Sequence, residues 1–288
     1  MFTIALGFAT SLVYGFADFF GALGSKFIRP VVVTFWSGLS GLALLLTASI
    51  FMGANFTPNS ILCGVIGGIA SAFAMSCLYA ALAIGPISIL SPLSAVVMAI
   101  VPMIIGFAGG DHFSLWGVLA LGAILVAVVL VGFVPGEDVR LPSIKGLLLG
   151  IGAGIGMGAV LLALAAAPHN SGLAAPAILR AVSASLLGIF MLVTLRNNRT
   201  PSHKPKVPTR IWLAVVATGF LDSSANLFFT IASRQGSLSV VSVLTALYPL
   251  GTIILARIFL KEKNSQKPDG WNRVGTRGFG GACRSLVA

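Results

Sequence analysis

The sequence predicts an all-α membrane protein that crosses the bilayer several times. Of its 288 residues, 57% are hydrophobic and only 9% are charged, whereas a soluble domain carries about 25% charged residues. The apolar residues fall into blocks of about 20, the length that spans a hydrocarbon core of about 30 Å. These observations exclude a water-soluble enzyme, because so few charges do not cover a folded surface that faces water.

Nine apolar blocks are predicted to be membrane-spanning helices. Each has roughly the required length, and their Gly and Ala residues allow helices to approach closely in lipid. The blocks are residues 2–23, 31–52, 61–83, 87–108, 115–134, 144–167, 173–195, 211–233 and 238–260. The three cysteines, Cys63, Cys77 and Cys283, lack a metal-binding spacing.

The distribution of basic residues predicts the orientation of the chain. A net charge of +11 would suggest nucleic-acid binding in a soluble protein, but here the basic residues lie in the gaps between apolar blocks. The gaps after odd-numbered blocks hold most of them, including five in residues 196–210, whereas those after even-numbered blocks offer only Arg234. Because cytoplasmic loops are rich in Lys and Arg, we expect the N-terminus outside. The bilayer, and not nucleic acid, is the expected partner.

An internal repeat relates the two halves of the chain. Residues 85–95 read GPISILSPLSA and residues 236–246 read GSLSVVSVLTA, and the same offset pairs Gly68 with Gly219. Because a five-helix unit is odd-numbered, its second copy enters the membrane from the opposite face, as in secondary transporters built from inverted repeats. Chance similarity among Gly-, Ala- and Ser-rich helices is the alternative. The predicted units are residues 1–134, residues 135–267 and a tail of residues 268–288.

Two motifs resemble a known family. The first motif is residues 14–19, Tyr-Gly-Phe-Ala-Asp-Phe. The second is the Gly-x-x-Ser-x-x-Ser opening of blocks four and nine, each followed by an acidic residue (Asp111 and Glu262). Both motifs resemble EamA-type members of the drug/metabolite transporter superfamily. The resemblance covers nearly all of residues 1–267. It implies ten helices in two inverted halves and the transport of small metabolites or drugs. The chain departs from the family in its predicted orientation and in lacking the tenth helix.

The tail, residues 268–288, does not continue the repeat. The counterpart of residues 115–134 would start near Gln266, but the tail has three arginines and no apolar run. One arginine at the centre of a membrane helix costs about 2.5–3.5 kcal/mol, so the tail is not predicted to span the bilayer. Two interpretations are open. The tail is either a natural polar segment or the product of a frameshift near Lys267, since the next frame can encode an apolar helix.

Ionisable side chains inside the predicted spans form the candidate site, because such groups are costly at membrane depth. Asp18 lies one helical turn after Tyr14, and Asn226 lies one turn after Asp222. Arg180 lies in the seventh block and can pair with either carboxylate. We expect the carboxylates to couple protons or bind a cationic group. The alternatives are a structural pair of Arg180 with Asp222 and an interfacial role for Asp18.

Four serines, Ser88, Ser91, Ser239 and Ser242, lie on equivalent faces near the starts of blocks four and nine. Their symmetry suggests a central polar lining, although serine in a membrane helix commonly bonds its own backbone. The sequence has no zinc-ligand pair, nucleotide-binding loop or catalytic triad in one plausible pocket. Neither enzyme activity nor a cofactor is therefore expected.

The leading hypothesis is a secondary transporter of small organic solutes in the plasma or inner membrane. It would work by alternating access between two inverted halves, with proton coupling and a homodimer as further options. The alternatives are a non-transporting scaffold or accessory subunit, and a non-functional frameshifted copy of a transporter. A scaffold does not need Asp18, Arg180 and Asp222 within the bilayer, which favours the transporter.

Overall fold

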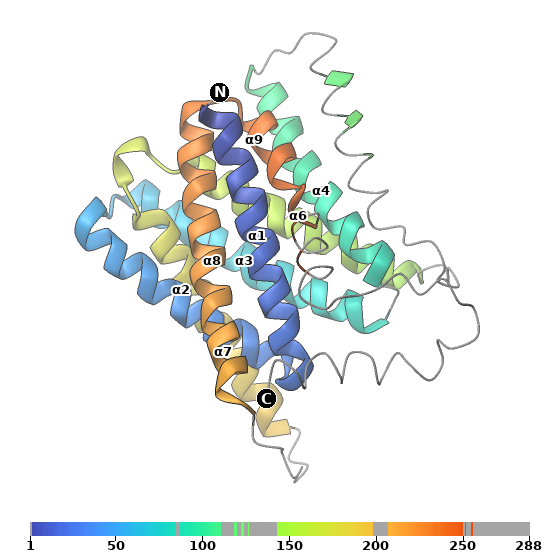
Figure 1. Cartoon of the computed structure of the whole chain (residues 1–288). Helices are drawn as coiled ribbons and strands as arrows, with labels where there is room; N and C mark the ends of the chain where they lie inside the picture. Colours follow the sequence, from blue (N-terminus) through green and yellow to red (C-terminus); the bar gives the residue numbers. More distant parts are fainter. Residues whose placement is uncertain are drawn as a thin grey trace.

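The computed structural model describes residues 2–84, 87–110, 118–119, 122–123, 126, 143–197, 207–249, 251 and 255. These residues form a bundle of α-helices (Figure 1). Its elements are α1 (Phe2–Phe27), α2 (Pro30–Met52), α3 (Pro58–Ile84), α4 (Ile87–Ala108), α6 (Ile144–Ala166), the short 3-10 helix η1 (His169–Ser171), α7 (Ala174–Asn197), α8 (Thr209–Gln235) and α9 (Leu238–Thr245).

Six of the described helices are long and apolar enough to cross a membrane, namely α1, α2, α3, α6, α7 and α8. Within the residues described, α4 contributes an apolar stretch over Pro92–Ala108, and α9 is described over eight residues. The predicted all-helical membrane protein is thus confirmed in outline. Most of the predicted span 115–134, the later part of span 238–260 and the tail 268–288 lie outside the described residues.

Local sequence signals determine where several helices begin. Pro30 opens α2 at a position where a missing N–H costs no hydrogen bond. At α6 the Ser143 hydroxyl accepts from the Gly146 N–H at 3.1 Å, and at α9 Ser237 accepts from the Val240 N–H at 3.4 Å. Both contacts satisfy N–H groups that the first helical turn leaves without partners.

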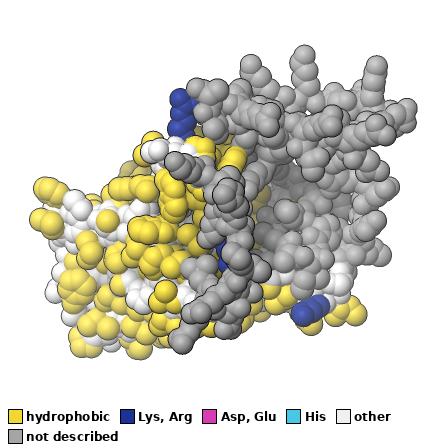
Figure 2. Space-filling model, turned by 90° about the horizontal axis from the view of Figure 1, so that it is seen from below, with side chains coloured by type: hydrophobic (Ala, Val, Ile, Leu, Met, Phe, Trp, Pro, Cys, Tyr) yellow, Lys and Arg dark blue, Asp and Glu magenta, His cyan; other side chains and the backbone are white. Residues whose placement is uncertain are grey.

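The outer surface of the described helices is apolar. In α1 the exposed residues Ile4, Phe8, Leu12 and Phe16 recur every fourth position and form one stripe. Figure 2 shows hydrophobic side chains over most of the coloured surface, with few basic groups. A surface of this kind is stable against lipid tails, and it accounts for the low fraction of charged residues in the sequence.

Small residues let the helices approach closely. A Cβ added to Gly68 of α3 would lie 2.6 Å from the Val182 Cβ and 2.9 Å from the Leu179 carbonyl oxygen, both in α7. Where α8 meets α2, a Cβ on Gly219 would collide with the Ser37 carbonyl oxygen and the Ser40 hydroxyl. Helices in lipid associate through such van der Waals contact, which requires small side chains at the crossing.

The helices before residue 110 pack mainly against the helices after residue 143. α1 and α2 both pack on α8, and α3 packs on both α6 and α7. In addition, α1 packs on α9 and α4 packs on α6. Two more contacts join α2 with α7 and α4 with α9. In Figure 1, α1 and α8 accordingly run side by side, although they are far apart in the sequence.

One end of the bundle is tied together by its loops. The Asn55 N–H donates to the Ser171 carbonyl at 3.0 Å, and the Leu173 N–H donates to the Gly53 carbonyl at 3.1 Å. Between these bonds Gly172 has φ 55°, a conformation that favours glycine, and a Cβ there would collide with the Gly53 carbonyl. The loop between α2 and α3 is therefore joined to the loop between α6 and α7.

At the same end of the bundle, Arg234 of α8 binds the loop between α6 and α7. Its guanidinium donates to the Pro168 carbonyl at 3.1 Å, the His169 carbonyl at 3.3 Å and the Ser171 hydroxyl at 3.3 Å. Near the start of α1, the Thr3 hydroxyl donates to the Gln235 carbonyl at 3.4 Å. The N-terminal end of α1 and the C-terminal end of α8 therefore lie at the same end of the bundle.

Candidate functional site

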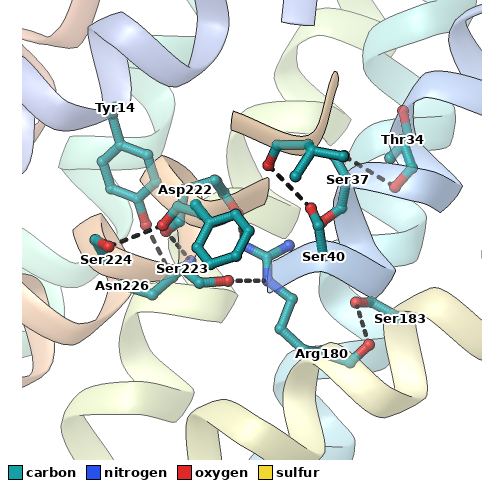
Figure 3. Close-up of polar contacts among 12 residues, drawn as sticks. Tyr14, Thr34, Ser37, Ser40, Arg180, Ser183, Asp222, Ser223, Ser224 and Asn226 are labelled. Atoms are coloured by element: carbon teal, nitrogen blue, oxygen red, sulfur yellow. Dashed lines mark hydrogen bonds and ion pairs between the residues drawn. The ribbon is translucent and has the colours of Figure 1, made fainter. Parts of the chain in front are cut away.

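An ion pair joins α7 and α8 inside the bundle. The Arg180 guanidinium contacts the Asp222 carboxylate, and the two side chains are only 12% and 25% exposed. The Arg180 Nε also donates to the Ser223 hydroxyl at 3.2 Å (Figure 3). Of the two carboxylates that the sequence offered to Arg180, the structure pairs it with Asp222. This pairing neutralises two charges that would each be costly alone.

A second set of hydrogen bonds joins α8 to α1. The Tyr14 hydroxyl donates to the Asn226 Oδ1 at 2.8 Å, and the Asn226 Nδ2 donates to the Asp222 backbone carbonyl at 2.9 Å. The amide of Asn226 is therefore held at both ends, and its oxygen points at the Tyr14 phenol (Figure 3). The predicted one-turn relation of Asp222 and Asn226 thus appears as a direct contact, though to the backbone of Asp222 and not to its carboxylate.

These residues lie deep within their helices. Tyr14 stands about 18 Å along α1 from Phe2, from a rise of about 1.5 Å per residue, and Asp222 lies near the middle of α8. Arg180 lies six residues after Ala174, the first residue of α7. Both α1 and α8 are long enough to cross a membrane, and the contacts between them lie far from the ends of both helices.

Asp18 is placed differently from Asp222. It shares one face of α1 with Gly7, Ser11 and Tyr14, and these three residues are buried or half-buried. Asp18 itself is exposed, yet it lies about a quarter turn or more away from the centre of the lipid-facing stripe that contains Phe16. The carboxylate is close enough to Tyr14 and Tyr248 to interact with both electrostatically.

Ser239 and Ser242 lie on a different helix from the residues of this network. Ser239 and Ser242 of α9 are fully buried, and the Ser239 hydroxyl donates to the Met103 carbonyl of α4 at 3.2 Å. The Ser242 hydroxyl is buried without a hydrogen-bond partner. They therefore lie in the contact between α4 and α9, apart from the Arg180–Asp222 pair. The side chains of Ser88 and Ser91 lie outside the described residues.

Three further residues lie at the site, and two of them, Ser223 and Gly41, were not predicted from the sequence. Ser223 accepts from Arg180, and Tyr248 is buried against α4, where it hydrogen-bonds with Ser94. Gly41 of α2 lies against Ser223 and leaves room for its hydroxyl, because a Cβ at this position would collide with it. Ser223 carried a weak signal, since it follows Asp222. The role of Gly41 depends on which helix faces meet, and no local pattern contains that information.

The described residues hold no group of three His, Cys, Asp or Glu side chains that could bind a metal ion. The arrangement combines a neutralised ion pair between α7 and α8, the Tyr14–Asn226 hydrogen bond between α1 and α8, and the Asp18 carboxylate and Tyr248 phenol, which interact electrostatically. Such a set can bind or exchange a charged group within a membrane.

Comparisons with known proteins agree with the membrane fold. Residues 144–267 match the model of the EamA-like transporter family, which confirms the family resemblance over these residues. No curated protein matches the chain. A solved structure described as "Crystal structure of protein" is similar, with a TM-score of 0.70 and 18% sequence identity over 89% of this chain and 89% of that chain. At this identity the similarity establishes a shared fold.

Proposed function

We propose, from the match of residues 144–267 to the EamA-like transporter family, that this chain is a secondary transporter of small organic solutes in the plasma or inner membrane. It works by alternating access between two inverted halves, and proton binding within the bundle drives the movement of the solute. The observation that carries the proposal is the set of three charged side chains, Asp18, Arg180 and Asp222, deep within apolar helices.

The contacts between helices support the proposal that the two halves are inverted repeats. If α1 to α4 correspond to α6 to α9, the contact of α1 with α8 corresponds to that of α6 with α3, and both occur. The match extends to single residues. Gly219 packs on Ser37 and Ser40, whereas its sequence counterpart Gly68 packs on Leu179 and Val182, again three residues apart. Two halves related in this way can rock against each other around a fixed central site.

The location of the charged residues supports a transport role. Tyr14 and Asp18 belong to the first half, and Arg180 and Asp222 belong to the second. A solute bound among them would contact both halves, so that its binding energy can differ between inward-open and outward-open states. Differential binding of this kind is required for a ligand to shift a conformational equilibrium.

The repeat does not extend to the charges. At the offset that pairs Gly68 with Gly219, the counterparts of Asp222 and Asn226 are Ser71 and Met75. Asp222 and Asn226 are therefore present in one half only and are not needed to build the helix bundle twice. This difference favours a binding role over a purely structural one, and it weakens the alternative of a non-transporting scaffold.

Reconstituted protein tests this function. The purified full chain is placed in liposomes loaded with a mixture of amines, amino acids, organic acids and sugars, and a pH gradient is imposed in either direction. Mass spectrometry then measures each solute inside and outside. We expect at least one solute to move faster than in protein-free liposomes, in proportion to the gradient. If no solute moves faster, in either direction and with either gradient, the chain is not a secondary transporter of these classes.

A further inference from the structure

The charges of the side chains deep within the described helices do not sum to zero. Among the described residues, the charged side chains that lie six or more positions from both ends of their helices are Asp18, Arg180 and Asp222. Because Arg180 contacts Asp222, their charges neutralise each other. One negative charge, on Asp18, remains in excess. An uncompensated charge at this depth is costly, so a proton or a cationic group is needed to balance it.

Asp18 is accessible to such a group. Its side chain is exposed, although it lies on the face of α1 that contains buried Ser11 and half-buried Tyr14. It does not belong to the lipid-facing stripe of Phe8, Leu12 and Phe16. The ion pair of Arg180 and Asp222 leaves this carboxylate available to a new partner.

Two tyrosine side chains interact with this carboxylate. Tyr14 and Tyr248 both interact with it electrostatically, and the Tyr14 hydroxyl is held by Asn226 at 2.8 Å. An aromatic ring attracts a cation through its negatively polarised face, by about 0.5–2 kcal/mol. Organic ammonium groups are recognised by this combination of a carboxylate and aromatic rings.

Other charge classes fit less well. An anionic solute would add a second uncompensated negative charge beside Asp18, because the charge of Arg180 is already balanced by Asp222. A metal ion such as Ca²⁺ requires six or more oxygen ligands, and no cluster of three acidic or His/Cys side chains occurs among the residues described. A single, partly apolar organic cation matches both the charge and the surroundings.

Building on the function proposed above, we infer that the transported solute carries one cationic nitrogen, which binds Asp18 between Tyr14 and Tyr248. The solute and a proton compete for this carboxylate, since either one alone balances its charge. The charged or titratable groups of the described site besides Asp18 are Tyr14 of the same helix, Arg180 of α7, Asp222 of α8 and Tyr248 after α9, and α2 has no ionisable residue. Of these groups, Tyr14 and Tyr248 interact with Asp18. Because Arg180 and Asp222 form a pair, Asp18 is the group at which binding and protonation compete.

Three probes of similar shape and different charge test this inference. They are 2-phenylethylamine, which is a cation at neutral pH, 2-phenylethanol, which is neutral, and 3-phenylpropanoate, which is an anion. Calorimetry measures their binding to the purified full chain in detergent. We expect the amine to bind at least ~10-fold more tightly than the other two, a difference of about 1.4 kcal/mol. Its affinity should rise with pH, and its binding should release protons.

Three variants locate this selectivity. Asp18→Asn should lose both the preference for the amine and the proton release, Asp18→Glu should keep both, and Lys145→Gln, which removes an exposed charge at the start of α6, should leave both unchanged. The inference is overturned if 3-phenylpropanoate binds more tightly than the amine, if none of the probes binds, or if Asp18→Asn retains the preference. A preference for another charge class would leave the transport function itself intact, which the solute-mixture assay tests separately.

Discussion

Arg180 of α7 and Asp222 of α8 form an ion pair within the bundle, and both side chains are largely shielded from solvent. The pair lies between two helices that are each long enough to cross a membrane. A paired charge of this kind is tolerated in an apolar interior, whereas either partner alone is not. Because Asp222 is paired with Arg180, Asp18 is the acidic group of the site that remains available to another partner.

A double-mutant cycle tests this ion pair. Arg180→Gln or Asp222→Asn alone should lower the free energy of unfolding by about 3–5 kcal/mol, because each leaves one charge without its partner. The double variant should lose clearly less than the sum of the two single losses. Denaturant titration in mixed micelles measures these values. Additive losses would show that the two side chains do not interact.

The Tyr14–Asn226 hydrogen bond is tested by removing the phenolic hydroxyl. Tyr14→Phe should lower the free energy of unfolding by about 0.5–1.5 kcal/mol, the net contribution of one hydrogen bond, and it should weaken the binding of 2-phenylethylamine. Phe16→Leu, on the lipid-facing stripe, is the matched control and should leave binding unchanged. Equal behaviour of the two variants would argue against a role for the Tyr14 hydroxyl.

Gly41 is expected to position Ser223 beneath Arg180. A Cβ at residue 41 would collide with the Ser223 hydroxyl and lie 2.8 Å from the Gly219 carbonyl oxygen. Gly41→Ala should therefore separate α2 from α8 and cost about 1–3 kcal/mol.

Gly38, one turn earlier on α2, provides the control for this prediction. An added Cβ there would lie 3.4 Å from the Ala184 Cβ, an ordinary contact. Gly38→Ala should therefore be neutral or stabilising, since Ala is the better helix former. Thermal unfolding of both variants makes the comparison, and an equally stable Gly41→Ala variant would contradict it.

Arg234 is expected to hold the loop of residues 168–173. Its guanidinium donates to two carbonyls and one hydroxyl of this loop, and hydrogen bonds from charged groups contribute about 1.5–3 kcal/mol. In Arg234→Gln the amides of residues 168–173 should exchange with deuterium about tenfold faster or more, while the middle of α8 is unchanged. Unaltered exchange in the loop would show that Arg234 does not hold it.

The sequence allowed most helix boundaries to be predicted within a few residues. Apolar blocks such as residues 144–167 correspond closely to α6, because bilayer thickness sets their length and Ser143 supplies the cap. The deep polar residues of the site were also identified, since a charge within such a block is conspicuous. Spacing within one helix was sufficient to relate Asp222 to Asn226.

Contacts between helices could not be predicted in the same way. Whether Arg180 pairs with Asp18 or with Asp222 depends on how α7 and α8 cross, which the close approach at Gly41 and Gly219 permits. The interpretation of Ser239 as part of a central lining likewise depended on packing. In the structure Ser239 is buried against the α4 backbone, where Pro102 precedes its acceptor, Met103.

The measurement that tests the central claim most directly is gradient-driven transport by Asp18→Asn. The solutes that move in the mixture assay are followed in liposomes containing wild type, Asp18→Asn or Lys145→Gln, with equal amounts of inserted and folded protein. Because the neutral amide neither binds a proton nor balances a cation, the Asp18→Asn protein should lose gradient-driven transport, whereas Lys145→Gln should retain it. Wild-type rates in the Asp18→Asn protein would contradict the claim that Asp18 couples the proton to the solute.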